Sequence, residues 1–410
     1  ELCAVEVYEV GKTWHEADGD ICEAIDFCRY YAREMKKLQA GQRVGHSKGE
    51  ISNYHYVPRG PTLVIAPWNF PLAILTGMVT GALVTGNTVI MKPAEQSSIT
   101  AAQLMRLIQI SGFPEGVVTF LPGFGEEVGE HLVGHKDIHT IAFTGSKDVG
   151  LHIVNQSSQL QNAQLYSKRC IIEMGGKNAI LIDSDADLDE AVIGVLYSAF
   201  GFQGQKCSAC SRVVVLDENY ERFIDRFLEA VKSIKILPAD NPQAFLGPVI
   251  DKEAYNKINA IIERGKDYAH LLYQGDAPED GYFIGPTVFT EVPTDSELAQ
   301  VEIFGPVLSI IKAKNFTEAI DIVNGTSFGL TGGIYSRSPA NIEKAKREIE
   351  VGNFYINRGI TGALVNRHPF GGFKLSGLGS KTGGPDYLKQ FMDPRVVTEN
   401  TMRRGFAPEE

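Results

Sequence analysis

The sequence predicts an α/β fold made of a Rossmann-like parallel sheet, a second α/β domain and a small β element outside both. Three observations carry this prediction. Short Val- and Ile-rich segments that end in turns alternate with helix-like segments, which is typical of parallel sheets covered by helices. This alternation runs twice, before and after residue 175. The 410 residues also exceed what one simple core holds, which favours two or three domains.

The first series lies before residue 150. The segments "TLVIAP", "NTVIMKP", "VVTFLP" and "TIAFTGS" are predicted strands. Helices are expected over 72–84, over 98–112 with Ser97 or Ser98 as cap, and over 126–133. Residues 60–91 carry no charge, which is compatible with a membrane span. Prolines, glycines and an asparagine break this stretch into a buried strand–helix–strand unit, so no membrane span is expected.

The second series follows Glu173. It contains the predicted strand "NAILID", a helix from Asp187, the strand "SRVVVLD" and a helix near 220–234. The strands "TVFTEV", "PVLSIIKA", "GGIYS" and "NFYIN" follow. Asp187 and Glu190 fit a capping box. The segment "ISNYHYVP" alternates and ends in proline, which predicts a strand outside the main sheets.

Composition narrows the class of protein. With 39 basic and 50 acidic residues the net charge is −11, and no dense Lys/Arg run is present, so a nucleic-acid partner is not expected. Six cysteines are few for this length, and no signal peptide is expected. This favours a reducing compartment, either a bacterial cytoplasm or a mitochondrial matrix. The chain opens in a helix-like segment without an initiator Met, so we expect the true N-terminus to lie upstream.

The loop "FGFQGQKCSACSR" places Cys207 three positions before Cys210. Structural zinc sites usually need a second such pair, and Cys22 and Cys28 are too far apart to supply it. A redox pair normally begins a helix, whereas "CSAC" runs into a predicted strand. Two alternatives remain, namely two buried small residues, or one nucleophile that Lys206 could help to ionise. The polar surroundings are not those of a core: Gln203, Gln205, Lys206 and Ser208.

Two distant residues could assist such a nucleophile. Glu173 follows a short apolar strand and precedes Gly175 and Gly176, which allow a close backbone approach. A carboxyl group among apolar residues has a raised pKa, which suits a general base, although a helix cap or ion pair is the alternative. Asn69 lies between two prolines in "APWNFP", where its amide could donate to an oxyanion or form an Asx turn.

Glycine-rich turns indicate a phosphate-containing ligand. The glycines of "FLPGFGEEVG" are one residue too widely spaced for a dinucleotide motif: Gly123, Gly125 and Gly129. In "FTGSKDVG", Gly145 and Ser146 lie between a strand and a helix, where backbone N–H groups and a hydroxyl can bind phosphate. Lys92 and Glu95 in "MKPAE" follow another strand. A carboxylate at a ribose would repel a 2′-phosphate, which favours NAD over NADP.

Seven motifs taken in order resemble the aldehyde dehydrogenase superfamily: "PWNFP", "KPAE", "FTGS", "EMGGK", "GQKCSA", "EIFGPV" and "PFGGFKLSG". They cover nearly the whole chain. Three further segments resemble the branch of 1-pyrroline-5-carboxylate dehydrogenases, which oxidise glutamate semialdehyde: "FGFQGQKCSACSR", "ITGALV" and "GGPDYLKQF". That branch occurs as a separate enzyme and as a domain of a bifunctional proline-oxidising protein.

The resemblance implies a role for each matching residue. Cys207 resembles the nucleophile and Glu173 the base, while Asn69 and the Cys207 N–H match the oxyanion hole. The residues implied to contact NAD are Pro67, Trp68, Lys92, Glu95, Gly125, Gly145, Ser146, Glu302 and Phe304. Those implied to hold the substrate carboxylate and methylenes are Ser208, Gly362, Ala363 and Phe370. No metal is implied.

The implied reaction is NAD-dependent oxidation of L-glutamate γ-semialdehyde to L-glutamate in proline catabolism, through a cysteine thioester. Oxidation of another carboxyl-bearing semialdehyde, such as succinate semialdehyde, is an alternative. Relatives carry further helices and sheet before the position of Glu1, so a catalytically silent module is the alternative from another class.

The resemblance also implies a division of the chain. Residues 1–45, 60–175 and 376–392 are expected to form the NAD-binding domain, and 176–375 the catalytic domain. Residues 46–59 and 393–410 match an oligomerisation flap and tail. A strand pair that seeks a partner fits a homo-oligomer.

Overall fold

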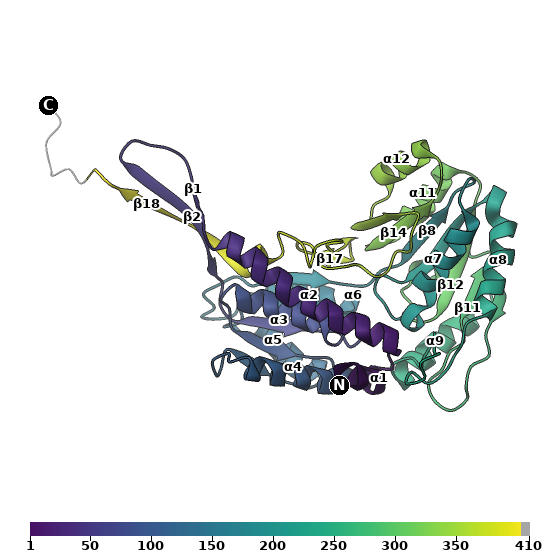
Figure 1. Cartoon of the computed structure of the whole chain (residues 1–410), viewed down its shortest axis with the longest axis horizontal. Coiled ribbons are helices and arrows are strands. Elements are labelled where there is room, and N and C mark those ends of the chain that lie inside the picture. The colour runs from purple at the N-terminus through teal and green to yellow at the C-terminus, as the bar shows by residue number, and fades with distance from the viewer. Residues whose placement is uncertain (403–410) are drawn as a thin grey trace.

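The computed structural model describes residues 1–402 and is built around two large sheets and a projecting arm (Figure 1). The first sheet has six strands in the order β17-β7-β6-β3-β4-β5. All neighbours are parallel except β17 and β7. The bounds are β3 (Thr62–Ile65), β4 (Val89–Lys92), β5 (Val118–Phe120), β6 (Thr140–Thr144), β7 (Arg169–Glu173) and β17 (Gly377–Leu378). The predicted strands of the first series are confirmed.

Strand order in this sheet reverses between β3 and β6. The chain runs from β3 to β4 and β5 on one side, then returns to place β6 on the other side of β3. In register, Ile65 at the end of β3 pairs with Lys92 on β4 and Phe143 on β6. In doubly wound sheets, ligands bind beyond the carboxyl ends of strands at such a reversal. The sheet therefore offers one defined edge for a ligand.

Helices cover this sheet. They are α1 (Leu2–Val10), α2 (Trp14–Leu38), α3 (Ala73–Val84), α4 (Ser98–Ile110), a π-helical turn η2 (Gly125–Gly129) that continues into α5 (Glu130–Gly134), and α6 (Lys147–Ser157). The expected helices are confirmed, with ends shifted by up to two residues. Ser97 precedes α4, but its side chain makes no capping hydrogen bond.

The uncharged stretch over 60–91 forms β3, α3 and β4. Most of α3 is buried, and Phe27 of α2 packs directly on Gly77, where an added Cβ would lie 3.1 Å from the ring. A helix that is apolar all round belongs in a protein core. In residues 1–402 we find no helix with the length and apolar character needed to cross a bilayer.

The second sheet has seven strands in the order β10-β11-β12-β9-β8-β14-β15, and only the edge strand β10 is antiparallel to its neighbour. The bounds are β8 (Asn178–Ile182), β9 (Cys210–Leu216), β10 (His270–Gln274), β11 (Thr287–Thr290), β12 (Val307–Ala313), β14 (Thr331–Tyr335) and β15 (Asn353–Ile356). The predicted strands of the second series are confirmed. β10 was not predicted from the sequence.

The helices of this second layer include α7 (Leu188–Phe200), α8 (Tyr220–Lys232), α9 (Lys252–Gly265), α10 (Glu297–Gln300), α11 (Phe316–Asn324) and α12 (Pro339–Glu348). Asp187 caps α7, because its Oδ1 accepts from the N–H groups of Asp189 and Glu190 at 3.1 and 3.4 Å. Of the predicted capping box, the Asp187 half is therefore present, whereas among the described residues the Glu190 side chain makes no return bond to the Asp187 N–H.

The last part of the chain returns to the first sheet. After β16 (Phe373–Lys374) pairs with β13 (Phe328–Gly329), β17 pairs with β7. The 3₁₀ helix η5 (Leu388–Phe391) then packs into the hydrophobic core between the six-stranded sheet and its helices. Tyr387 stacks on Tyr31 of α2 with ring centroids 5.4 Å apart. The two layers are thus joined at 174–177 and again by this return.

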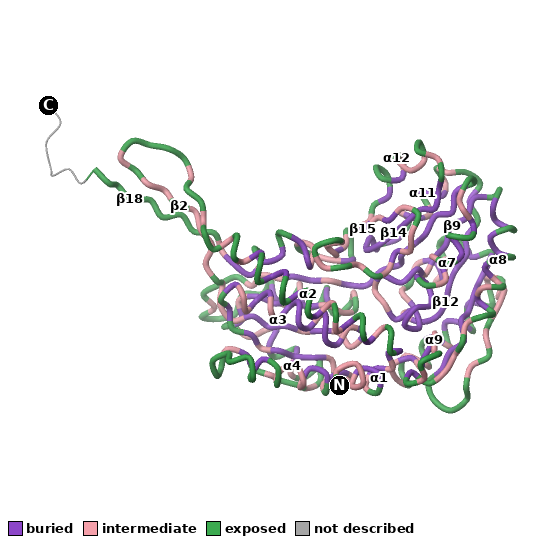
Figure 2. Tube along the Cα trace, in the orientation of Figure 1, coloured by how far each residue is buried: buried purple, intermediate pink, exposed green. Residues whose placement is uncertain are grey.

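The arm is a three-stranded antiparallel sheet of β1 (Gln42–Arg43), β2 (Glu50–Pro58) and β18 (Met392–Asn400). It projects away from both large sheets, and most of it is exposed (Figures 1 and 2). The predicted strand outside the main sheets is confirmed as β2. Of the predicted flap tail, residues 403–410 lie outside the described residues.

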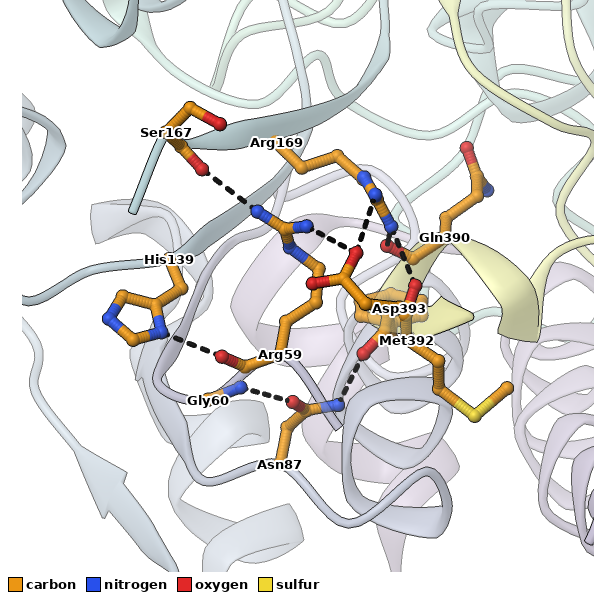
Figure 3. Close-up of polar contacts among 10 residues, drawn as sticks. Arg59, Gly60, Asn87, His139, Ser167, Arg169, Gln390, Met392 and Asp393 are labelled. Atoms are coloured by element: carbon orange, nitrogen blue, oxygen red, sulfur yellow. Dashed lines mark hydrogen bonds and ion pairs between the residues drawn. The ribbon is translucent and has the colours of Figure 1, made fainter. Parts of the chain in front are cut away.

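A dense hydrogen-bond network fixes the root of the arm (Figure 3). Asp393 Oδ1 accepts from Arg59 Nη1 at 2.6 Å and from Arg169 Nη2 at 2.9 Å. Arg169 Nη1 also donates to the carbonyl groups of Gln390 and Met392. Asn87 bridges the backbone of residues 60 and 391. The arm is therefore anchored to β7 and to the segment before β3.

Candidate active site

Several predicted site residues lie along one edge of the six-stranded sheet. The turn that carries Asn69 follows β3, Lys92 ends β4, and Glu173 ends β7. Gly145 and Ser146 follow β6. This is the edge at which strand order reverses, so the fold brings these residues to the position where such sheets bind ligands.

The loop before β9 carries Cys207 and has a constrained backbone. Phe202, Gln203 and Gly204 all have positive φ, at 48°, 56° and 67°. Left-handed conformations cost about 1–3 kcal/mol for residues other than glycine, so other contacts must hold them. A Cβ on Gly204 would lie 2.4 Å from the Gly305 carbonyl oxygen, so only glycine fits there. We call residues 200–207 the nucleophile loop.

The loop is buried to a degree that the sequence analysis did not predict. Gln203 and Gln205 are fully buried and Ser208 is nearly so, hence the expectation that these polar residues lie outside the core was wrong. Burial is possible for Gln203 because its Nε2 donates to the carbonyl groups of Gly11 and Pro248 at 3.1 and 2.7 Å. Backbone groups far away in the sequence thus satisfy the Nε2 of this amide.

The expected influence of Lys206 on Cys207 was also wrong. Lys206 Nζ pairs with Glu16 of α2 at 2.7 Å. The pKa of the Cys207 thiol is raised far above its usual value, first by burial and then by the negative charges of Glu173 and Glu302. The surroundings therefore hold the thiol protonated until another charge or a proton acceptor acts on it.

Asn178, at the start of β8, holds the other end of the loop. Its Nδ2 donates to the carbonyl groups of Cys207 and Ala209 at 2.7 and 2.9 Å, and its Oδ1 accepts from Thr331 N at 3.0 Å. Gly176 must be glycine here, since a Cβ would lie 2.8 Å from the Cys207 carbonyl oxygen. The close backbone approach predicted for the glycine pair is confirmed.

Asn69 links the two halves of the site. It is buried, and its Nδ2 donates to the Gln205 carbonyl oxygen at 3.0 Å. An amide nitrogen carries two hydrogens, so the second can point toward an oxyanion. The turn after β3, residues 66–72, is thereby tied to the nucleophile loop across a sequence separation of 136 residues. We call this segment the oxyanion turn.

Glu173 has the raised pKa that the sequence predicted. Burial raises the pKa of its carboxyl group to about 8, and the positive charge of Lys381 opposes the shift. Lys381 Nζ donates to the carbonyl groups of Gly352 and Gly371 and to Asn353 Oδ1, which fixes its charge beside the acid. A carboxyl group with a pKa near the working pH can take and return a proton.

The first part of the predicted cofactor site lies at the ends of β4 and β6. Lys92 Nζ lies 3.0 Å from Glu95 Oε1 and is almost fully buried. Burial raises the pKa of Glu95, but backbone hydrogen bonds, including one from Gly125, and the bond from Lys92 hold it below its usual value. Ser146 caps α6, because its Oγ accepts from Val149 N at 3.4 Å. These are a carboxylate, an ammonium group and a helix N-terminus.

The second part comes from the seven-stranded layer. Glu302 Oε1 accepts from Gly176 N at 2.8 Å, and burial raises the pKa of its carboxyl group to about 6. A Cβ on Gly175 would lie 2.0 Å from Glu302 Oε2, so glycine is required. Phe304 meets Trp68 edge-on with centroids 5.7 Å apart. Both layers therefore contribute to one site.

The residues expected to bind the substrate are less closely connected. The Ser208 carbonyl oxygen accepts from Thr331 Oγ1 at 3.3 Å, and the backbone of Phe370 pairs with Thr382. Gly362 has a φ of 71°, and nothing lies within 4 Å of an added Cβ. Within residues 1–402, no hydrogen bond joins Gly362 or Ala363 to the nucleophile loop.

Sequence analysis missed two charged residues near the nucleophile. Burial, and then Asp20, raise the pKa of Glu23 on α2 to about 8, and its charge contributes to the raised pKa of Cys207. Lys381, from the far end of the chain, acts in the opposite direction, because its positive charge lowers the pKa of Glu173. Glu23 sits among other acidic residues of a helix and Lys381 in a glycine-rich segment, so neither carried a local signal.

The sequence profile of the aldehyde dehydrogenase family matches residues 1–397. The chain belongs to the aldehyde dehydrogenase family. One relative is the 1-pyrroline-5-carboxylate dehydrogenase of Anoxybacillus flavithermus, which is 48% identical to this chain over 400 residues. The alignment covers 97% of this chain and 78% of that protein. The family resemblance inferred from the seven motifs is confirmed.

Solved structures agree with this assignment. The 1-pyrroline-5-carboxylate dehydrogenase from Thermus with bound NAD is 50% identical, has a TM-score of 0.96, and covers 98% of this chain and 78% of its own. Proline utilization A from Bdellovibrio bacteriovorus is 65% identical with a TM-score of 0.98. This chain is covered completely by that protein but spans only 43% of its length. The aldehyde dehydrogenase fold is thus shown.

Within this family member, the two cysteines of the nucleophile segment differ in surroundings. Cys207 is partly exposed, whereas Cys210 is buried at the start of β9 with its Sγ donating to the Arg212 carbonyl oxygen at 3.2 Å. Both are free thiols. Over the described part of the chain, no group of three or more His, Cys, Asp or Glu side chains is placed to hold a metal ion.

Proposed function

We propose that this chain catalyses the NAD-dependent oxidation of L-glutamate γ-semialdehyde, formed from 1-pyrroline-5-carboxylate, to L-glutamate. One observation carries the chemistry: the 3.0 Å hydrogen bond from Asn69 to the nucleophile loop unites an oxyanion donor with Cys207. Glu173 lies close enough to raise the pKa of that thiol. The substrate class rests on the relatives, which are named 1-pyrroline-5-carboxylate dehydrogenases.

The residues present fit NAD. Lys92 and Glu95 offer an ammonium group and a carboxylate for ribose hydroxyls, and the N-terminus of α6, which follows β6 at the same sheet edge, can bind phosphate. Glu302 offers a second carboxylate, and Trp68 and Phe304 supply aromatic surface. Pro67 and Gly145 follow β3 and β6 at the same edge, and the backbone of Gly125 donates to Glu95. When bound, NAD supplies the acceptor for the hydride that leaves the substrate.

Catalysis begins with Cys207. Its thiol passes its proton to solvent water, and the sulfur attacks the aldehyde carbon while the C=O electron pair moves to the oxygen, which forms a tetrahedral adduct. Asn69 Nδ2 and the Cys207 N–H donate to the oxyanion, which lowers the barrier because the charge develops only on the way to this adduct. When the carbonyl re-forms, hydride departs and a thioester to Cys207 remains.

Glu173 then completes the cycle. Its carboxylate accepts a proton from water, which attacks the thioester and releases the carboxylic acid product. Because burial raises the pKa of Glu173 to about 8, the base is deprotonated only toward alkaline pH. Turnover limited by this step should increase with pH up to about 8. The thiol is regenerated when the leaving sulfur is protonated.

Substrate choice is proposed to depend on charge. The Ser208 hydroxyl and the backbone N–H groups of Gly362 and Ala363 can hold a carboxylate without a bulky side chain. Phe370 can pack on the methylenes. Glu23 places an acidic group near Cys207, which suits a substrate with a cationic amino group. An amino acid semialdehyde meets both requirements, and a simple alkyl aldehyde meets neither.

The assembly and the domain division also belong to this proposal. The cofactor domain comprises 1–45, 60–175 and 376–392, the catalytic domain 176–375, and the arm 46–59 with 393–410. The long exposed edge of β18 favours pairing with a second copy, hence a homo-oligomer. The named relatives are bacterial, which favours a cytoplasmic over a mitochondrial setting.

The decisive experiment measures NADH formation with L-glutamate γ-semialdehyde, succinate semialdehyde and propanal at equal concentrations. We expect the highest kcat/KM for glutamate semialdehyde. A preference for propanal would remove the proposed substrate class, and a preference for succinate semialdehyde would remove the role of the amino group. No NADH with any aldehyde would show that this chain is a silent module.

A further inference from the structure

We propose that Lys12 is a positioning residue, whose buried ammonium group holds the oxyanion turn and the nucleophile loop in one fixed arrangement. The inference rests on the proposed function, because it concerns how Asn69 and Cys207 are aligned. Lys12 lies between α1 and α2 and is fully buried. It is absent from every motif that pointed to the chemistry.

The burial of Lys12 is costly. Its Nζ lies 3.4 Å from Asp20 Oδ1 and 3.9 Å from Glu6 Oε2, and all three side chains are inaccessible to solvent. Among the described residues this Nζ has no hydrogen-bond partner. Burial and the neighbouring Asp20 raise the pKa of Glu6 to about 10. Asp20 is the nearer of the two carboxyl groups to the ammonium group. A buried ion pair of this kind adds little stability, which points to another role.

The ammonium group touches both segments of the site. It lies 4.2 Å from the ring centroid of Phe70 and 5.1 Å from that of Phe202. Phe70 directly follows Asn69 in the oxyanion turn, and Phe202 lies in the left-handed part of the nucleophile loop. Contacts of a cation with aromatic rings are strongest where water is excluded. One charge thus binds the two segments at once.

Neighbours of Lys12 reinforce both contacts. Asp20 Oδ2 accepts from the N–H groups of Leu72 and Ala73 at 3.1 and 3.3 Å, so it caps α3 at the end of the oxyanion turn. Leu72 at the cap position has no side-chain cap of its own. Gln203 Nε2 donates to the Gly11 carbonyl oxygen, which anchors the nucleophile loop to the same junction. Residues at the α1–α2 junction and in α2 therefore contact both the oxyanion turn and the nucleophile loop.

This arrangement predicts a specific kinetic defect. Asn69 and Cys207 must converge on one carbonyl group, and a misplacement of about 1 Å costs up to about 100-fold in rate. Replacing Lys12 by Met keeps the length of the side chain and removes the charge. We expect Lys12→Met to lower kcat by about 10- to 100-fold and to leave the KM for NAD within about twofold.

A double variant separates positioning from charge balance. Lys12→Met with Asp20→Asn leaves no uncompensated charge, and the Asn side-chain oxygen can still cap α3. We expect this double variant to recover the urea midpoint of the wild type while the kcat defect persists. In an Asn69→Ala background, Lys12→Met should cost less than about threefold, because both changes act through the same turn.

The control variant is Lys312→Met. Lys312 makes the same kinds of contact, with its Nζ 5.1 Å from the Tyr220 ring and paired with Asp217, but it touches neither segment of the site. We expect its kcat to equal that of the wild type.

Hydrogen–deuterium exchange provides a readout that needs no substrate. Amides of residues 67–73 and 200–207 should exchange at least about tenfold faster than in the wild type in Lys12→Met and in the double variant. In Lys312→Met their exchange rates should equal those of the wild type. If the wild type oxidises none of the aldehydes, the proposed function falls and exchange alone decides the role of Lys12. Unchanged exchange in both segments, or full recovery of kcat in the double variant, would overturn the inference.

Discussion

The root of the arm and the nucleophile loop are both polar, but they differ in how many of their buried polar groups have hydrogen-bond partners. At the root, Arg59, Arg169 and Asp393 bond one another and nearby carbonyl groups. Among the buried polar side-chain atoms of these three described residues, Arg59 Nε alone lacks a partner. In the loop, both side-chain polar atoms of Gln205 and the Oε1 of Gln203 are buried without one among the described residues.

The contrast separates scaffold from site. Polar groups that saturate one another make a rigid joint and have no capacity left for a ligand. Unsatisfied buried groups cost stability, so they persist where a ligand or a reaction uses them. Changes in the nucleophile loop should therefore affect activity, and changes at the root should affect stability and assembly.

The largest effect is expected for Cys207→Ala. Loss of the nucleophile should lower kcat by about 10⁴-fold or more, while NAD binding measured by calorimetry stays intact. If the variant still oxidised aldehydes at a substantial rate, the nucleophile would lie elsewhere. The nucleophile loop would then not differ from the root of the arm in its role.

Glu173→Gln should come next, with kcat lowered by about 10²- to 10⁴-fold. The thioester should accumulate, and mass spectrometry of the intact protein should detect the added acyl group. In the wild type, kcat should increase with pH toward a plateau above about 8, following the raised pKa of Glu173, and the variant should lose this dependence. Failure of the variant to form any acyl-enzyme would show that Glu173 acts before hydride departure.

Glu173→Gln should also change stability in a pH-dependent way. The folded-state pKa of this acid is raised, so the unfolded chain loses its proton first and the wild type becomes less stable as pH increases from about 4.5 to about 8. The neutral Gln avoids this loss. Urea midpoints should therefore favour the variant at pH 9 and agree with the wild type at pH 4. A midpoint difference independent of pH would contradict the assigned shift.

Asp393→Ala tests the opposite region. It removes the partner of Arg59 and Arg169, and since Asp393 is 37% exposed the cost should be about 1–2 kcal/mol of unfolding free energy. Sedimentation should show less of any oligomer, while kcat per subunit stays within about twofold of the wild type. A collapse of kcat without a change in stability would mean that the arm root communicates with the site.

Cys210→Ser should have the smallest effect. The serine hydroxyl can still donate to the Arg212 carbonyl oxygen, so kcat should change by less than about twofold. This variant is the matched control for Cys207→Ala, three positions away. Loss of activity comparable to that of Cys207→Ala would revive the redox-pair alternative.

Features that depend on neighbouring residues in the chain could be predicted from the sequence, whereas features that depend on distant residues could not. The alternation of apolar segments fixed β3, α3 and β4, because their burial depends on neighbouring residues in the chain. The raised pKa of Glu173 was predictable from its apolar flanks. The burial of Gln203 and the pairing of Lys206 with Glu16 were not, because the partners Gly11, Pro248 and Glu16 lie far away in the sequence. Lys12, Glu23 and Lys381 act only through contacts that the fold creates.

The return of the C-terminal segment has a consequence for biosynthesis. Tyr387, Leu388 and Phe391 complete the core of the six-stranded layer, although all strands of that layer except the edge strand β17 lie before residue 175. During synthesis on a ribosome, the core of the six-stranded layer therefore stays incomplete until the whole seven-stranded layer has been made. The seven-stranded layer, which is continuous in sequence from β8 to β15, can close first. Folding order in this chain should therefore run against the order of translation.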